Sequence, residues 1–244
     1  MSCSDIFVAN DGSVYSVGTM MDTESYQIDP VLVKWDVLGN PVWTSVWNRS
    51  DNCRADDLVV HDSYVYTLMT GFIHPYDSYQ RIVAKWDQNG DILWFSSIST
   101  TEDPYITGTI ATDSDGFIYV LTANYHIVGG SLLIDNVLMK LSPEGSQVWN
   151  VTADGDVDSI DEYDMCITEN GTLFTSHFNN SGICKWDTDG NLLESLPWTD
   201  VMSQLTLDPT GFLYSITPKT IPSQISLKRW TQDLHAMWEA VVSA

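Results

Sequence analysis

Basic side chains are scarce in this sequence of 244 residues, where 10 lysines and arginines stand against 33 aspartates and glutamates. The formal net charge at pH 7 is therefore −23. Nucleic acids and anionic membranes attract proteins through their phosphates, and this attraction has the wrong sign here. The composition excludes a nucleic-acid-binding function and favours a surface that attracts cations.

Long apolar runs are also absent. No stretch reaches the run of about 18 apolar residues that crosses a bilayer, so membrane insertion is not expected. The first residues, Met1–Asp5, have neither a basic region nor a long apolar core, so they do not form a secretory signal. A strand pattern begins at once with Ile6, which is typical of a mature or trimmed domain or of a fragment of a longer gene.

Motifs of metal binding and catalysis are missing as well. None of the four cysteines lies in a C-x-x-C pair, so zinc is not expected. The sequence has no G-x-S-x-G, no H-E-x-x-H and no glycine-rich phosphate loop. Paired carboxylates can hydrolyse glycosides, but a chain with 33 acids contains such pairs by composition alone. A non-enzymatic function is therefore favoured.

What the sequence does contain is a repeat. A basic residue, an apolar residue and a turn recur at intervals of 44 to 55 residues. The copies are Lys34–Gly39, Lys85–Gly90, Lys140–Gly145, Lys185–Gly190 and a decayed fifth, Arg229–Asp233. A period of this length indicates repeated supersecondary units.

Each unit has the pattern of four strands. Two short apolar strands flank an Asp/Asn/Gly turn, a third strand carries the basic residue, and a second tight turn leads to the fourth. The fourth strand usually holds a tryptophan: Trp43, Trp94, Trp149 and Trp238, with Glu194 in the fourth copy. The pattern predicts an all-β fold, a β-propeller of five four-stranded antiparallel blades.

The predicted blades are about 1–46, 47–98, 99–152, 153–197 and 198–244, in one domain over 1–244. No strand is left over to complete another blade. Closure of the ring would therefore rest on blade-on-blade packing rather than on a shared sheet. Five blades can close a ring, and a segment of a larger propeller would have the same pattern.

Two copies share the spacing D-x-x-G-x-x-x-W, at Asp36–Trp43 and Asp87–Trp94. This spacing resembles the tryptophan-docking motif of quinoprotein-like propellers. The whole unit is similar to the bacterial and archaeal β-propeller repeats of secreted and surface proteins. The resemblance covers nearly the full chain and implies the fold rather than an activity. It fails at Ser142, Glu194 and Leu234, so the third, fourth and fifth blades are expected to pack less regularly.

The repeated residues have a structural explanation. A tryptophan at one place in each outer strand can bury its ring against the next blade. The aspartate after each lysine can bond its own turn, and the lysine stem can lie on aromatic surface while its head meets a carboxylate. The residues expected to dock the blades are Lys34, Trp35, Asp36, Trp43, Lys85, Trp86, Asp87, Trp94, Lys140, Trp149, Lys185, Trp186, Asp187, Trp230 and Trp238.

The longer connections share one face of the predicted propeller. They lie at 20–30, 71–80, 123–135 and 217–224, and we call this the long-segment face. A scaffold that keeps one face minimal and lengthens the other usually binds with the second. Tyrosine and histidine offer contact area for sugars or peptides. The candidate ligand residues are Tyr26, His74, Tyr76, Asp77, Tyr79, Tyr105, Tyr125 and His126.

Acidic residues are densest at 154–164. Asp154, Asp156 and Asp158 offer the hard oxygen ligands that calcium requires, although the EF-hand pattern is not met. Both a calcium site and a solvated acidic loop are consistent with this composition. The pair Asp56–Asp57, at the equivalent place in the second blade, is a candidate for the mouth of the central channel.

Two further features, the glycosylation sequons and the cysteines, bear on whether the protein is secreted. The sequons at Asn48, Asn150, Asn170 and Asn179 favour a secreted, exposed protein. Among the cysteines, Cys166 and Cys184 fall on the first and third strands of one blade. These strands are too far apart for a disulfide, which needs α-carbons within roughly 7 Å. Cys3 and Cys53 are at nearly equivalent points of adjacent blades, and a bridge there stays open.

The sequence thus favours a non-enzymatic, extracellular or surface-exposed module that binds a protein or a glycan through its long-segment face. Calcium is the one cofactor that the sequence suggests. One alternative is a propeller enzyme acting on glycans, as a hydrolase or lyase. A quinone-dependent dehydrogenase has less support, because no cofactor-clamping residues are recognisable. Another alternative is a purely structural repeat of a surface fibre.

Overall fold

The computed structural model describes residues 2–48, 51–72, 79–101, 108–128, 131–154, 164–176, 181–197, 204–219 and 224–243. These residues form five four-stranded antiparallel sheets, each made of four strands consecutive in the sequence. The prediction of an all-β fold with five such sheets is confirmed. None of the described residues belongs to a helix long and apolar enough to cross a membrane.

Blade 1 contains β1 (Ser2–Val8), β2 (Val14–Met21), β3 (Ile28–Trp35) and β4 (Pro41–Val46). Blade 2 contains β5 (Asp51–His61), β6 (Tyr64–Phe72), β7 (Tyr79–Trp86) and β8 (Ile92–Thr101). Blade 3 contains β9 (Gly108–Thr112), β10 (Ile118–Val128), β11 (Ser131–Leu141) and β12 (Gln147–Asp154). Blade 4 contains β13 (Met165–Ile167), β14 (Leu173–Ser176), β15 (Ser181–Trp186) and β16 (Leu192–Pro197). Blade 5 contains β17 (Gln204–Leu207), β18 (Leu213–Lys219), β19 (Gln224–Trp230) and β20 (Ala236–Ser243).

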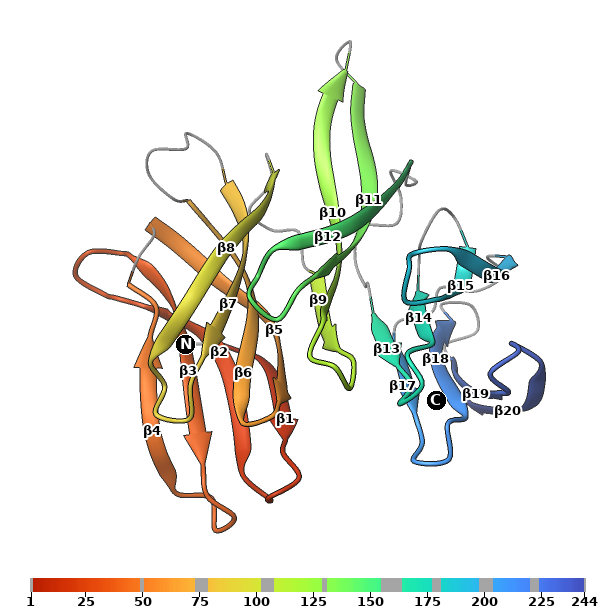
Figure 1. Ribbon diagram of the computed structural model, residues 1–244, viewed down its shortest axis with the longest axis horizontal. Coiled ribbons are helices and arrows are strands. Elements are labelled where there is room, and N and C mark those ends of the chain that lie inside the picture. The colour runs from red at the N-terminus through yellow and green to blue at the C-terminus, as the bar shows by residue number, and fades with distance from the viewer. Residues whose placement is uncertain are drawn as a thin grey trace.

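The five blades follow one another in space as in the sequence, from red to blue in Figure 1. Strands of each blade pack against those of the next, from blade 1 through to blade 5. Among the described strands, no pair from blades 5 and 1 packs in a comparable way. The domain 1–244 stays a prediction, and the ring is open between its first and last blades.

The apolar core is divided into four clusters, one between each pair of successive blades. Between blades 1 and 2, for example, Tyr15, Val17 and Leu32 pack against Leu58 and Met69. Period-two alternation directs one side of each sheet toward the preceding blade and the other side toward the following blade. A single blade therefore has no enclosed core of its own, and each depends on its neighbours.

The turn between the third and fourth strands is built by an aspartate. Asp36 Oδ1 accepts hydrogen bonds from the amides of Leu38 at 2.9 Å and Asn40 at 2.8 Å. Asp87 and Asp187 make the same pair of bonds in blades 2 and 4. These bonds close a tight turn whose last residue has a positive φ, which a glycine adopts without strain.

In blade 3 a serine replaces this aspartate. Ser142 Oγ accepts from the amides of Glu144 at 3.3 Å and Ser146 at 3.4 Å. The hydroxyl oxygen thus stands where the carboxylate oxygen stands in the other turns. The expectation that blade 3 is irregular because of Ser142 is therefore wrong.

The tryptophan of each fourth strand reaches the turn of the next blade. A β-carbon added at Gly90 would lie 2.9 Å from the ring of Trp43, so the turn admits the indole because it lacks a side chain. The indole Nε1 of Trp43 donates a hydrogen bond to the carbonyl oxygen of Gln88 at 2.7 Å. We call this arrangement the indole–turn contact.

The indole–turn contact recurs at the next two interfaces. Added β-carbons at Gly145 and Gly190 would lie 2.7 Å from the ring of Trp94 and 3.1 Å from that of Trp149. Trp149 Nε1 also donates to the carbonyl oxygen of Thr188 at 3.0 Å. Three of the four interfaces thus use one geometry.

The interface between blades 4 and 5 departs from this geometry at both of its partners. Glu194 replaces the tryptophan, and Leu234, with a φ of 52°, replaces the glycine of the receiving turn. Leu234 is 4% exposed and belongs to the core cluster between these blades. Lys185 Nζ lies 2.8 Å from Asp233 Oδ1 in the same turn. The two departures compensate, because a turn without an indole above it can bury a side chain instead.

The lysines lie over aromatic rings beside these contacts. Lys34 Nζ is 5.2 Å from the ring centre of Tyr15, and Lys85 Nζ is 5.1 Å from that of Tyr66. Lys140 repeats the arrangement in blade 3 and also lies 3.7 Å from Asp113 Oδ2. Each lysine stem therefore supports the same wall of the blade as the docking tryptophan.

The tryptophans of the third strands behave differently. Each indole nitrogen donates to a hydroxyl on the second strand of its own blade, on the side that faces the preceding blade. The pairs are Trp35 with Ser16, Trp86 with Thr67, Trp186 with Thr175 and Trp230 with Ser215, at 2.9 to 3.0 Å.

None of the four cysteines forms a disulfide. Cys166 lies on β13 and Cys184 on β15, and β14 separates them, as the sequence predicts. Cys3 is exposed and Cys53 is buried, and the bridge left open between them is not formed.

A stability comparison tests the indole–turn contact. Trp149→Ala removes a partly buried indole from its turn, and we expect it to lower the free energy of unfolding by about 3 kcal/mol, the low end of the range for Trp→Ala. Trp238→Ala is the matched control, because Trp238 is 41% exposed. In dilute protein we expect the control to cost less than about 1 kcal/mol. Guanidinium unfolding measures both, and equal losses would contradict the assigned role.

Candidate functional site

The inner strands of all five blades line one central cavity of about 830 Å³. These strands are β1, β5, β9, β13 and β17, the first of each sheet. Their beginnings follow the blade-to-blade connections, so they lie toward the long-segment face. The cavity is the place where all five repeats contribute to one surface.

One polar position recurs in, or directly before, each inner strand. Strand pairing places these residues opposite equivalent points of the second strands. The residues are Asp5, Asp57, Thr109, Asp164 and Gln204, and we call them the channel ring. The first four line the central cavity.

The aspartates of the channel ring each bind the next inner strand. Inner strands are sheet edges, so their outward amides need a partner from elsewhere. The bonds run from Leu58 N to Asp5 Oδ2 at 3.3 Å, from Ile110 N to Asp57 Oδ2 at 2.8 Å and from Leu205 N to Asp164 Oδ2 at 2.6 Å. Thr109 Oγ1 also donates to Asp57 Oδ2 at 2.7 Å.

The carboxyl of Asp5 acts on both of the other carboxyls. Burial raises the pKa of Asp57 well above its usual range, and a hydrogen bond with the Asp5 carboxyl adds to this. Burial also raises the pKa of Asp164 to about 6, and the charge of Asp5 acts in the same direction. Carboxyls from blades 1, 2 and 4 therefore converge on the cavity. A protonated carboxyl beside an ionised one provides both a hydrogen-bond donor and an acceptor.

Asp56 does not lie at the channel. Its Oδ2 is 3.0 Å from Arg81 Nη1, and both side chains are buried within blade 2. Thr70 Oγ1 donates to the same carboxylate oxygen at 2.8 Å. A bulge in β5 between Ala55 and Asp57 accompanies this arrangement. Of the predicted pair, Asp57 therefore lines the cavity, and Asp56 forms an internal ion pair.

The candidate ligand residues are only partly within the described chain. Tyr79 begins β7, and its ring lies 5.7 Å from that of Phe72 at the end of β6. Tyr26 is 72% exposed and has a φ of 59°. Tyr125 and His126 lie on β10. The predicted residues outside the described ranges are His74, Tyr76, Asp77 and Tyr105.

The strands β10 and β11 form a ribbon that projects beyond the other strands (Figure 1). β10 pairs with β9 only up to Thr122, whereas its pairing with β11 continues to Val128. The ribbon carries Tyr125 and His126 opposite Ile134 and Leu133. The long connection predicted at 123–135 is therefore largely a β-hairpin.

The predicted metal and glycan positions are untested. Asp154 ends β12, and Asp156 and Asp158 lie outside the described residues. Within the described part of the chain, no group of His, Cys, Asp and Glu is placed to hold a metal ion. The sequon asparagines Asn48, Asn150 and Asn170 are exposed, and Asn179 lies outside the described ranges.

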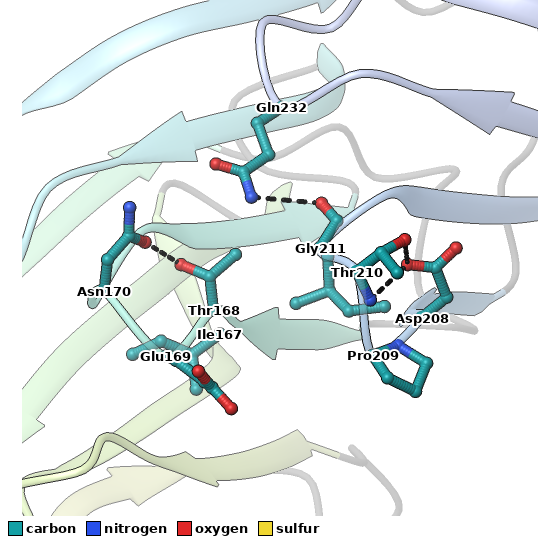
Figure 2. Close-up of a pocket in the computed structure, with 10 residues that line it drawn as sticks. Ile167, Thr168, Glu169, Asn170, Asp208, Pro209, Thr210, Gly211 and Gln232 are labelled. Carbon is teal, nitrogen blue, oxygen red and sulfur yellow. Dashed lines mark hydrogen bonds between the residues drawn. The ribbon is translucent and has the colours of Figure 1, made fainter.

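A smaller pocket of about 320 Å³ lies at the opposite face, between the first turns of blades 4 and 5. Figure 2 shows that Thr168 bonds to Asn170 and Thr210 to Asp208, each within its own turn, and that Gln232 of the second turn of blade 5 bonds to Gly211 of the first turn. These groups stabilise the turns, so we interpret the pocket as a gap between two hairpins and not as a binding site.

Comparisons with known proteins identify the fold. No family model and no curated protein matches the sequence. The chain is similar to a Bacteroides caccae protein of unknown function, with 8% identity, a TM-score of 0.56 and coverage of 93% of this chain and 72% of that one. For a quinonprotein alcohol dehydrogenase-like protein of Bacteroides thetaiotaomicron the values are 13%, 0.54, 99% and 66%. For a Synechocystis apocarotenoid oxygenase variant they are 10%, 0.56, 98% and 64%.

The chain adopts a β-propeller fold. It spans about two thirds of the length of these larger proteins, one of which is of unknown function. At such low identity the similarity establishes the fold and leaves the activity to be argued from the site.

The channel ring could have been predicted from the sequence, although it matches no catalytic or binding motif. The ring has no common residue type, but it occupies one column when the repeats are aligned, four residues before the first turn. An apolar residue follows it directly in every copy. A recurring polar residue there indicates the channel.

The pH dependence of stability tests the buried carboxyls. The folded pKa of Asp164, about 6, exceeds the unfolded value of about 3.9, so its contribution is full at low pH and lost as the pH rises through 6. Hydrogen bonds lower the pKa values of the turn aspartates Asp36 and Asp187, whose contribution is lost as the pH falls below about 4.

We therefore expect the free energy of unfolding to be greatest near about pH 4 to 5. Asp164→Asn should flatten the decline of this free energy between about pH 4 and 6. Asp189→Asn is the control, because the equivalent turn position in blade 2 is already an asparagine, Asn89. Urea unfolding across this range measures the effect, and identical slopes in the wild type and Asp164→Asn would refute it.

Proposed function

We propose that this chain is a non-enzymatic β-propeller module that binds a glycan or a protein at its long-segment face. The observation that carries the proposal is the position of the central cavity. It is lined by all five inner strands, and its carboxyl groups stand at the end of this lining that is farther from the tight first turns, and so on the side of the long-segment face. Propellers commonly bind where variable segments surround a rigid channel mouth.

The chemistry of the channel ring favours a glycan over a protein. Sugar hydroxyls both donate and accept hydrogen bonds, and a site with protonated and ionised carboxyls matches both functions. Thr109 adds a hydroxyl next to Asp57. The aromatic side chain of Tyr79 at the same face offers an apolar surface of the kind that sugars and peptides contact.

An extracellular or cell-surface location is part of the proposal. The exposed sequon asparagines support it, because glycosylation needs an accessible acceptor in a secreted protein. The net charge of −23 supports ligands other than nucleic acid.

Binding to glycan and protein arrays tests the proposal. Asp5→Asn removes the charge that faces two other carboxyls, and we expect it to weaken binding at least about tenfold. Replacement of 73–78, or of the ribbon residues 124–134, with Gly-Ser linkers should also reduce binding. Asp189→Asn provides the control on the opposite face. Unchanged binding by Asp5→Asn and by both replacements would contradict the proposal.

A glycan-acting enzyme is the second candidate, and the raised pKa of Asp57 beside Asp5 is the observation that favours it. A carboxyl that keeps its proton can act as a general acid on a glycosidic bond. Polysaccharide turnover with and without calcium distinguishes the candidates. We expect no release of reducing ends. Release that Asp57→Asn abolishes would instead identify an enzyme.

A further inference from the structure

The two ends of the row of blades expose surfaces that are buried everywhere else. The outward face of blade 1 contains Ile6, Val8, Val14, Ser16 and Trp35, and we call it the blade-1 face. The outward face of blade 5 contains Tyr214, Ile216, Ile225, Trp238 and Val242, and we call it the blade-5 face. Each corresponds, residue by residue, to a face used at an internal interface.

The blade-1 face corresponds to the face on which the preceding blade packs at each internal interface, but among the described residues no blade covers it. Ile6 is 63% exposed, whereas Leu58, its equivalent in blade 2, is 3% exposed beneath blade 1. A largely apolar groove of about 500 Å³ runs along this face and includes Ile6, Val14, Trp35 and Val37. The groove lies where a preceding blade would pack.

The turn between β3 and β4 of blade 1 likewise has no indole packed on it. Gly39 is the equivalent of Gly90, Gly145 and Gly190, each of which lies under an indole of the blade before. A β-carbon added at Gly39 would meet nothing within 4 Å. Blade 1 therefore has the glycine that an indole requires, without an indole above it.

The blade-5 face is the matching donor surface. Trp238 lies 6.1 Å from Tyr214, the same separation as that of Trp43 from Tyr15 in blade 1. Its indole is thus held in the orientation of an indole that docks. Trp238 is nevertheless 41% exposed.

The remainder of the blade-5 face is exposed too. Ile216 is 37% and Ile225 is 56% exposed, whereas Val17, the equivalent of Ile216 in blade 1, is 2% exposed. Val242 extends the same apolar surface and is 68% exposed. Apolar surface of this extent on one sheet face is typical of an interface.

We propose that the blade-5 face of one copy docks on the blade-1 face of a second copy, head to tail. The indole of Trp238 lies on Gly39 of the next copy, and its Nε1 donates to the carbonyl oxygen of Val37. That carbonyl is the equivalent of the acceptors at Gln88 and Thr188. The contact is heterologous, so each copy keeps one donor and one acceptor face.

Electrostatics sets the conditions of this association. Each copy carries a net charge of −23, so two copies repel one another at long range. Salt screens that repulsion with a Debye length of about 8 Å at 0.15 M ionic strength, and the apolar contact itself is insensitive to screening. The association therefore strengthens as salt is added.

Sedimentation velocity over a range of protein concentrations tests the proposal at 0.15 and 0.5 M sodium chloride. The wild type should associate reversibly, and more tightly at the higher salt. Trp238→Ala removes the donor, and Ile6→Glu places a charge in the acceptor groove. Each variant alone should associate at least about tenfold more weakly than the wild type, since a docking hot spot is lost. Leu93→Glu adds the same charge at a residue 51% exposed on β8, away from both faces, and should behave as the wild type.

Mixing the two variants gives the decisive result. Trp238→Ala keeps an intact acceptor and Ile6→Glu keeps an intact donor, so together they should form a one-to-one dimer that grows no further. A wild type that stays monomeric at every concentration overturns the proposal, including the case in which blade 5 closes onto blade 1 of the same chain. Association that neither variant weakens, or a mixture that forms no dimer, overturns it equally.

Discussion

The contact between an indole and a glycine turn is the interaction on which the arrangement of this molecule depends. Each blade is a sheet with two apolar sides and no enclosed core, so its stability comes from the blades beside it. Trp43 on Gly90 shows the requirement most simply, because the indole needs a turn without a side chain and a carbonyl in reach. The recurrence of lysine, aspartate, glycine and tryptophan in the sequence follows from this one contact.

The docking of the blades also builds the candidate site. It aligns the inner strands, and the alignment places Asp5, Asp57 and Asp164 around one cavity. Buried carboxyls are costly, but here each of them satisfies an edge amide of the following blade. The same groups thus join neighbouring blades and supply the polar chemistry of the cavity, so we expect their protonation to affect stability and, under the proposed function, binding as well.

The sequence predicted the five sheets and the tight-turn face, because strand alternation and turn residues are local signals. It placed both Asp56 and Asp57 at the mouth of the channel, and only Asp57 lines the cavity, because a bulge in β5 directs Asp56 to Arg81. It also grouped Trp35 with Trp43, although their indoles bind partners in different blades. The mutual compensation of Glu194 and Leu234 depends on contacts across an interface, which the sequence of either blade alone does not reveal.

The same contact accounts for the two exposed end faces, one with an indole and no turn, the other with a turn and no indole. The most direct measurement is an experimental structure of the self-associated protein at high salt. The account predicts the indole of Trp238 on Gly39 of the neighbouring copy, with its Nε1 bonded to the Val37 carbonyl. An assembly joined through any other surfaces, with the indole of Trp238 still in solvent, would contradict it.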